Sequence, residues 1–161
     1  MGLKGDFQGL RRLRGQLADM KSPAFMRAMS EVLAAEAREL VDEGFASSKD
    51  PSGQPWAPLA MRDGQPLRDT GRLQRSFTTE VHDRGFVIGT NTRYAHVHQF
   101  GATIEPVAAK ALAFQVRGRG WVRLKKAVIP ARKMLPDGGR LPPPWDRAMK
   151  AAARAQMKAN F

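Results

Sequence analysis

The feature that most constrains the fold is a run of helical periodicity from residue 23 to residue 46. Apolar side chains recur there at every third or fourth position, and acidic side chains take mainly the other face. Ser22 and Pro23 precede the run as a helix cap and a first-turn proline. The pattern predicts one helix of about 35 Å at 1.5 Å per residue. In so small a chain, such a helix is long enough to pack against a neighbouring subunit.

Residues 1–22 form a shorter helical extension of the same amphipathic kind. Its apolar positions repeat at helical spacing: Phe7, Leu10, Leu13, Leu17 and Met20. Gly9 and Gly15 weaken this prediction. The extension has no long apolar core of the signal-peptide kind, and no stretch of the chain approaches the roughly 20 apolar residues of a membrane span. We therefore expect a soluble protein that is made in a cytoplasm and has no membrane partner.

Residues 47–69 read SSKDPSGQPWAPLAMRDGQPLRD, a composition that interrupts helices and favours turns. A long irregular segment of this kind in a small domain is usually functional or disordered. Trp56 and Leu59 are large apolar side chains that it can bury, so we expect the loop to order against a partner or against the domain. We predict both residues as anchors for a partner, with Trp56→Ala abolishing assembly while leaving the protomer folded.

Residues 70–135 carry the signals of a mixed α/β core. A short capped helix begins near Asp69 and carries Leu73 and Phe77 inward. Short β-prone runs follow at 78–83, 85–90, 111–116 and 120–129, with a hairpin turn predicted at residues 83–85. Residues 136–161 then predict a basic terminal helix with an apolar stripe of Trp145, Met149 and Met157.

These signals predict one α+β domain over residues 1–161. In this fold, a small antiparallel sheet packs against the long N-terminal helix, and the chain adds a long irregular loop and a C-terminal basic helix.

The segment YAHVHQFGA, residues 94–102, raises the question of a metal site. On a strand, His96 and His98 would project to one side and could bind one ion. A zinc site needs a third or fourth ligand. Few candidates lie nearby: Tyr94, Gln99, Glu105 and the more distant His82. No HExxH spacing or carboxylate pair accompanies the histidines, so we expect no metal.

The structural interpretation of the same segment is a short helix or turn. Tyr94, Val97 and Phe100 would then be buried at helical spacing, while His96 and His98 make hydrogen bonds or face solvent.

The sequence also lacks the patterns of nucleophilic catalysis and of nucleotide binding. There is no cysteine, which excludes disulfides, thiolate metal sites and a cysteine nucleophile. Ser52 and Ser76 lie in no GxSxG motif, and no P-loop or GxGxxG motif is present. We expect no catalytic residues and no cofactor.

The charge is strongly basic and unevenly distributed. The formal net charge is +12, and from residue 117 to the end twelve Lys and Arg face two acidic residues. Such a balance attracts polyanions or acidic protein surfaces. The candidates for contact with DNA or with an acidic partner are Arg117, Arg119, Lys125 and Lys126. Trp121 could stack on a single strand, although one tryptophan on a strand is more often part of a core.

Four segments taken in order resemble the phage virion morphogenesis family, which includes tail completion proteins. They are GQPWAPL (53–59), PLRDTGRLQRSF (66–77), VIGTNTRYAHVHQFGA (87–102) and VIPARKML (128–135). The resemblance covers roughly residues 23–135. It departs from the family pattern at Met134, where an aromatic residue is usual, and at Lys133, where proline is common. These two differences bear on how residues 128–135 dock and not on the resemblance to the family.

The resemblance implies a structural virion protein of the neck or tail, assembled in the host cytoplasm. Its copies would form a ring, by family expectation a hexamer, at the head-proximal end of the tail. The implied partners are the head-tail connector or adaptor, the tail terminator, tube or sheath proteins, and genomic DNA passing through the lumen. The interface candidates are Trp56, Leu59, Leu67, Thr70, Gly71, Leu73, Tyr94, His98, Gln99, Phe100, Gly101, Pro130 and Arg132.

Two other hypotheses remain open at this point. The basic C-terminal third also fits a small nucleic-acid-binding module that is not part of a virion. A metal-dependent hydrolase using His96 and His98 is a third class.

Overall fold

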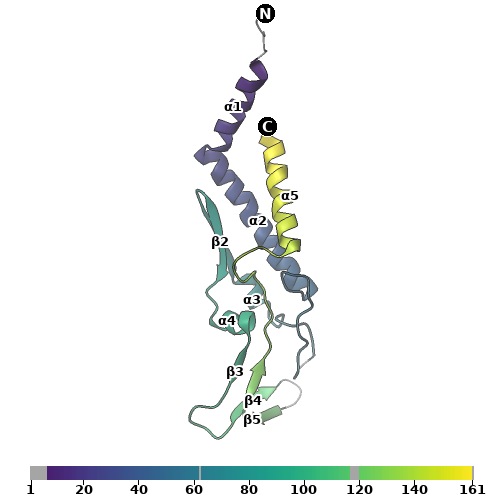
Figure 1. Cartoon of the computed structure of the whole chain (residues 1–161). Helices are drawn as coiled ribbons and strands as arrows, with labels where there is room; N and C mark the ends of the chain where they lie inside the picture. Colours follow the sequence, from purple (N-terminus) through teal and green to yellow (C-terminus); the bar gives the residue numbers. More distant parts are fainter. Residues whose placement is uncertain (1–6, 62, 117–119, 161) are drawn as a thin grey trace, which may run out of the picture.

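The computed structural model describes residues 7–61, 63–116 and 120–160, and the fold is α+β as predicted (Figure 1). The helices are α1 (Gln8–Met20), α2 (Pro23–Ser47), α3 (Arg72–Arg75), α4 (Arg93–Phe100) and α5 (Pro143–Asn160). The strands are β1 (Phe77–His82), β2 (Gly85–Thr90), β3 (Ala102–Ile104), β4 (Leu112–Val116), β5 (Gly120–Leu124) and β6 (Ala127–Ile129).

Helix α2 is the longest element and confirms the prediction for residues 23–46. The Ser22 hydroxyl accepts a hydrogen bond from the Phe25 backbone N–H at 3.2 Å, and Pro23 occupies the first turn. The helix ends where Ser48 adopts a left-handed conformation. Strands β1 and β2 and helix α5 all pack against α2.

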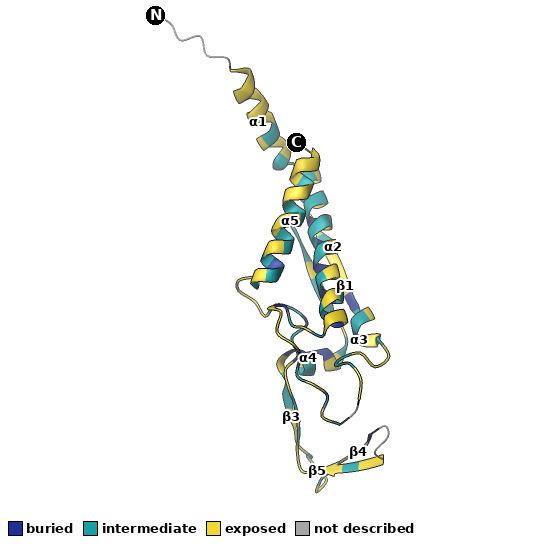
Figure 2. Cartoon of the chain, turned by 90° about the vertical axis from the view of Figure 1, so that its right-hand side faces the viewer, coloured by how far each residue is buried: buried dark blue, intermediate teal, exposed yellow. Residues whose placement is uncertain are grey.

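The core forms along one face of α2, where Ala37, Val41 and Phe45 are almost fully buried (Figure 2). The Phe45 ring meets the rings of Trp56 and Phe77 edge to face, at centroid distances of 5.5 and 6.0 Å. The other buried members are Leu73, Ala95, Met134 and Trp145. Segments far apart in sequence thus share one apolar cluster.

The strands pair in three separate two-stranded antiparallel ladders, whereas we expected one sheet. β1 pairs with β2 from Phe77 opposite Thr90 to His82 opposite Gly85, so the predicted hairpin is confirmed. β3 pairs with β6, and β4 pairs with β5. Helix α4 and a long connection separate the first ladder from the others, so only the first ladder packs on α2.

The loop after α2 is irregular but fixed to the protein. The Asp50 carboxylate accepts hydrogen bonds from the Ser52 and Gln54 backbone N–H groups at 2.8 and 2.9 Å, which closes a turn. Farther along, the Gln65 side-chain amide donates to the backbone carbonyls of Phe45 and Ala46 at the end of α2. The loop therefore orders against its own domain.

Trp56 is part of the core and is only 6% exposed. Its indole N–H donates to the Lys133 carbonyl at 2.8 Å. This burial contradicts the prediction that Trp56 is an anchor for a partner. It also leads us to expect that Trp56→Ala destabilises the protomer, which replaces the earlier expectation that the variant stays folded. The ring is used within the chain, where it joins the loop to residue 133.

Two elements project from opposite ends of the molecule (Figure 1). Helix α1 extends beyond the start of α2 and buries none of its residues. The β4–β5 ladder lies at the other end, below α3 and α4 in the figure. No helix in the described part of the chain combines the length and apolar character needed to cross a membrane.

Candidate functional site

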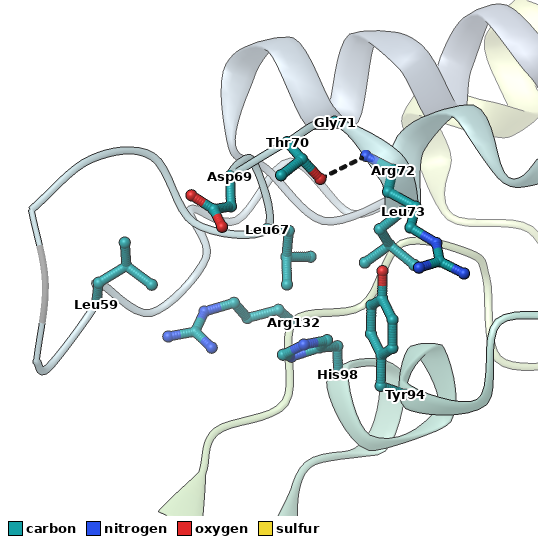
Figure 3. Close-up of a pocket in the computed structure, with 10 residues that line it drawn as sticks. All are labelled: Leu59, Leu67, Asp69, Thr70, Gly71, Arg72, Leu73, Tyr94, His98 and Arg132. Carbon is teal, nitrogen blue, oxygen red and sulfur yellow. Dashed lines mark hydrogen bonds between the residues drawn. The ribbon is translucent and has the colours of Figure 1, made fainter. Parts of the chain in front are cut away.

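A pocket of about 320 Å³ lies between the end of the loop, α3, α4 and the segment after β6 (Figure 3). Most of the interface candidates converge on it from these four separate segments. The lining residues are Leu59, Leu67, Asp69, Thr70, Gly71, Arg72, Leu73, Tyr94, His98 and Arg132. Three leucines supply an apolar lining, and Arg72, Arg132, His98, Tyr94 and Asp69 supply polar groups.

The turn that enters α3 owes its shape to backbone conformations that few residues adopt. Leu67 and Gly71 have positive φ angles of 59° and 73°. A Cβ on Gly71 would lie 2.6 Å from Nη1 of Arg75, the end of an exposed side chain that can move aside, so it is the positive φ that favours glycine. The Thr70 hydroxyl accepts from the Arg72 backbone N–H at 3.3 Å (Figure 3). The turn thereby holds Leu67 and Leu73 on the pocket wall.

Arg132 joins the pocket to the loop. Its side chain is 5% exposed, and its Nε and Nη2 groups donate to the Ala57 and Pro58 carbonyls at 2.8 Å each. Its backbone N–H donates to the His98 carbonyl at 2.6 Å. A buried guanidinium is stable only with such hydrogen bonds. Arg132 therefore fixes three segments around the pocket at once.

His98 lies on α4 beside Tyr94, whose ring meets the imidazole edge to face at a centroid distance of 6.0 Å. The imidazole Nδ1 atom is buried and has no hydrogen-bond partner among the described residues. Burial lowers the pKa of His98 below its ordinary value of 6.5, and the positive charge of Arg132 lowers that pKa further. The pocket therefore favours the neutral imidazole.

This lowered pKa predicts a loss of stability in mild acid. The unfolded chain binds the His98 proton more readily than the folded chain, so the contribution of His98 is complete above about pH 6.5 and is lost as the pH falls below it. We expect the Tm of the wild-type protein to fall more steeply from pH 7 to pH 5 than the Tm of His98→Gln. His96→Gln, at an exposed histidine of the same helix, is the control and should keep the wild-type slope. Equal slopes for the wild type and His98→Gln would contradict the prediction.

Gln99 is not among the residues that line the pocket, and it holds the segment after β6. Its amide oxygen accepts from the Met134 and Leu135 backbone N–H groups at 2.8 and 3.2 Å, and its amide N–H donates to the Leu135 carbonyl at 2.6 Å. The side chain thus replaces a strand partner for residues 134–135 and satisfies backbone groups that the core would otherwise leave unpaired.

Gly101 allows the chain to pass close to the strand end that carries Arg132. Its φ and ψ angles are 76° and 165°, a region almost restricted to glycine. A Cβ there would lie 3.0 Å from both the Ala131 nitrogen and the Ile129 oxygen. Both the conformation and the space require glycine.

We therefore expect Gly101→Ala to lower the free energy of unfolding by about 2–4 kcal/mol, from strain and displaced backbone. Gly120→Ala is the matched control because Gly120 has a φ of 77° but nothing within 4 Å of an added Cβ. Strain alone should cost the control about 1–2 kcal/mol. Urea unfolding measures both, and equal losses would mean that the close approach contributes nothing.

The interpretation of residues 94–102 as a helix is confirmed, but its buried face is different. Tyr94 and Phe100 are 42% and 56% exposed, whereas Ala95 and Gln99 are buried. The prediction that Tyr94, Val97 and Phe100 form the buried face is therefore wrong. The physical reason is that Gln99 finds backbone partners for its amide, which makes a polar side chain the better one to bury.

The remaining interface candidates lie outside the pocket. Trp56 is in the core, Gln99 and Gly101 hold the chain after β6, and Pro130 and Phe100 are exposed at the surface. Of the four basic contact candidates, Lys125 and Lys126 are exposed between β5 and β6. Arg117 and Arg119 lie outside the described residues. Trp121 on β5 is 73% exposed, so it is not part of a core.

Sequence reasoning missed two polar lining residues, Asp69 and Arg72, although both flank the Thr70–Gly71 turn that it did identify. It also missed Arg38 on α2, which donates to the Phe77 and Gln74 carbonyls at 3.0 and 3.2 Å. Their position beside a glycine turn is a signal by which Asp69 and Arg72 could have been found in the sequence. Locally, Arg38 shows only an ordinary i,i+4 ion pair with Asp42, because the two carbonyls that it binds lie 36 and 39 residues away.

The two histidines do not converge. Both lie on α4 two residues apart, and such positions point in different directions on a helix. His96 instead packs on the Phe100 ring at a centroid distance of 4.9 Å. Within the described residues, no three His, Cys, Asp or Glu side chains are grouped closely enough to hold a metal ion. The arrangement presents a partly apolar recess with a cationic edge, which suits contact with a side chain or peptide of another protein.

Comparisons with known proteins identify the family of the chain. The model of the phage virion morphogenesis family matches residues 6–140. Mu-like prophage FluMu G protein 2 of Haemophilus influenzae is 36% identical over 96 residues, which are 59% of this chain. The match spans 57% of that relative, so a large part of its length has no counterpart in the alignment. No solved structure matches the chain.

Proposed function

This chain belongs to the phage virion morphogenesis family, and on that premise we propose that it is a structural joint of the virion. It serves bacteriophage morphogenesis. In our proposal, its copies close into a ring at the head-proximal end of the tail, join the tail to the connector and catalyse no reaction. Genomic DNA would pass through the lumen.

The observation that carries the proposal is the exposed apolar surface at both ends of the molecule. Helix α1 exposes Leu10, Leu13 and Leu17 by 51–63%, and the far hairpin exposes Trp121 by 73%. A helix of 13 residues is marginal in water without a packed face, and so is an isolated two-stranded hairpin. The two exposed apolar surfaces differ and lie at opposite ends of the protomer. They suit heterologous contacts, in which different surfaces of neighbouring copies meet, and such contacts generate a ring when the rotation between copies closes.

The pocket supports the same proposal. Its walls are set by hydrogen bonds of the protomer itself, so the recess exists before a partner arrives, and it combines leucines with cationic groups. A ring would repeat each such contact in every subunit, and multivalency would make the joint firm although each contact is weak.

The test is a complementation experiment on particles. A phage or prophage that lacks this chain should yield separate heads and tails, and supply of the full chain should restore joined particles, counted by electron microscopy. Normal joining without the chain would contradict the proposal.

A nucleic-acid contact is a second candidate for the hairpin end. Trp121 and Arg123 are both exposed and lie two residues apart on β5, so they share one face of the strand, and the exposed Lys125 and Lys126 follow in the chain. DNA binding should then weaken steeply as salt is raised, and Trp121→Ala should weaken the binding of single strands. Affinity that is independent of salt would exclude this contact.

A further inference from the structure

Helix α1 has an apolar face that its own protomer does not cover. Leu10, Leu13 and Leu17 lie within about 60° of one another around the helix at 100° per residue, while Arg12 lies on the opposite side. The helix has no buried residue, and Phe7 beside it is 60% exposed. An amphipathic helix of this kind needs a groove to bury its stripe.

The same molecule has an apolar groove without an occupant among the described residues. It has a volume of about 400 Å³ and lies between α2, β2 and the start of α5. Its walls include Leu33, Phe86, Ile88, Leu141, Trp145 and Met149. Helix-in-groove contacts use an apolar stripe at i, i+3 and i+7, which is the spacing of Leu10, Leu13 and Leu17.

The elbow between α1 and α2 keeps the stripe away from the groove of the same chain. The backbone N–H groups of Lys21 and Ser22 donate to the Ala18 and Asp19 carbonyls at 3.1 and 3.0 Å, which closes the end of α1. The Ser22 hydroxyl caps the start of α2. Pro23 has a fixed φ and restricts the preceding Ser22 to the extended conformation that it adopts. α1 therefore points onward beyond the domain (Figure 1), so a groove that receives its stripe would belong to another copy.

The charge of α1 is complementary to that of α2 as a whole. α1 carries three arginines and one aspartate, whereas α2 carries two arginines and five acidic residues in a chain of net charge +12. Glu36, Glu39 and Glu43 form no ion pair within the described residues. The groove lining itself carries one charged side chain, the basic Arg140, and α5 is basic too. Any attraction therefore comes from acidic residues of α2 outside the lining, and burial of the leucines must provide most of the affinity.

We propose that α1 of one copy docks its Leu10–Leu13–Leu17 stripe into the α2–β2–α5 groove of the next copy. The contact is heterologous, because helix and groove are different surfaces, and it can therefore continue from subunit to subunit until the ring closes. This inference rests on the proposed function in assuming that copies of the chain associate. It assigns one interface of that association.

Cross-linking tests the contact directly because the natural chain has no cysteine. Leu17→Cys and Leu141→Cys chains, each with one thiol, are mixed and treated with a short bismaleimide. We expect a covalent dimer that contains one chain of each kind. Arg12→Cys, on the opposite face of α1, is the control and should give far less product with Leu141→Cys.

Other products would overturn the inference. Dimers of Leu17→Cys alone would mean that α1 pairs with α1. A chain carrying both thiols that closes on itself without forming dimers would mean that α1 folds back into its own groove. The absence of any mixed dimer at concentrations where the wild type is oligomeric would also overturn it, while leaving the ring proposal standing.

A charge-matched pair of variants gives a second measurement. Leu13→Asp with Leu17→Asp changes the net charge by the same amount as Arg12→Glu. We expect self-association to weaken by about 100-fold or more in the first and by less than about fivefold in the second, followed by sedimentation. Unchanged association of the first variant contradicts the inference but not the ring. A wild type that is monomeric throughout and binds phosphatidylserine vesicles through the same leucines contradicts both.

Discussion

Trp56→Ala is expected to lower the free energy of unfolding by about 3–5 kcal/mol, because it removes a large aromatic ring from the centre of the core. The ring is 6% exposed, meets Phe45 edge to face at 5.5 Å, and donates to the Lys133 carbonyl at 2.8 Å. The loss is a large part of the total stability of a small domain, so much of the variant should be unfolded at 37 °C. Chemical denaturation with far-UV circular dichroism measures it.

The chain offers a matched control for this change. Trp121→Ala makes the same substitution at a side chain that is 73% exposed, and it should change stability by less than about 1 kcal/mol. Trp56→Phe retains a ring but removes the N–H donor, and it should cost about 1–2 kcal/mol. If Trp56→Ala remained as stable as Trp121→Ala, the assignment of Trp56 to the core would fail.

Arg132→Ala is expected to cost about 2–4 kcal/mol and to release the loop that ends in the pocket. The guanidinium holds the Ala57 and Pro58 carbonyls at 2.8 Å, and hydrogen bonds from a charged group are each worth about 1.5–3 kcal/mol. Water can reach the freed carbonyls, because Pro58 is exposed, which reduces the total. Limited proteolysis should cut residues 57–68 faster in the variant, under conditions where the rest of the chain remains folded.

The matched control for Arg132 is Arg75→Ala. Arg75 also donates to a backbone carbonyl, that of Thr70 at 2.9 Å, but its side chain is exposed. Its loss should cost less than about 0.5 kcal/mol and leave the loop resistant to cleavage. Equal effects of the two variants would mean that burial gives Arg132 no special role.

The parts of the fold that sequence predicted well are those fixed by local signals. The long helix follows from its own periodicity and from the Ser22–Pro23 start, and the β1–β2 hairpin follows from two β-prone runs around a short turn. Each signal lies within the element that it specifies. The tertiary contacts of these elements are consistent with their local preferences, so local signals were enough to predict them.

The parts that sequence predicted wrongly depend on distant partners. Trp56 was predicted at an interface because no partner for its ring is visible nearby in the sequence. The carbonyl group that accepts its N–H belongs to Lys133, 77 residues away. Gln99 was not assigned to the core because an amide is buried only where it finds partners, and these lie 35 and 36 residues away. The division into three ladders likewise depends on which strands meet in space.

The candidate pocket could be predicted only in part from the sequence. Many of its lining residues were singled out in the motifs around Thr70–Gly71, Tyr94–His98 and Arg132, but Asp69 and Arg72 were not. That these motifs converge on one recess required the structure, and their role at an interface stays a prediction. The groove and the uncovered face of α1 were not predicted as a pair, although the apolar stripe was. A stripe in sequence does not say whether its own chain covers it.

The central claim is that copies of this chain close into a ring that joins tail to head. Native mass spectrometry of the purified full chain tests it most directly. The account predicts one closed species, for a hexamer six times 17.8 kDa or about 107 kDa, without a series of longer forms. A protein that stays monomeric at every concentration would contradict it.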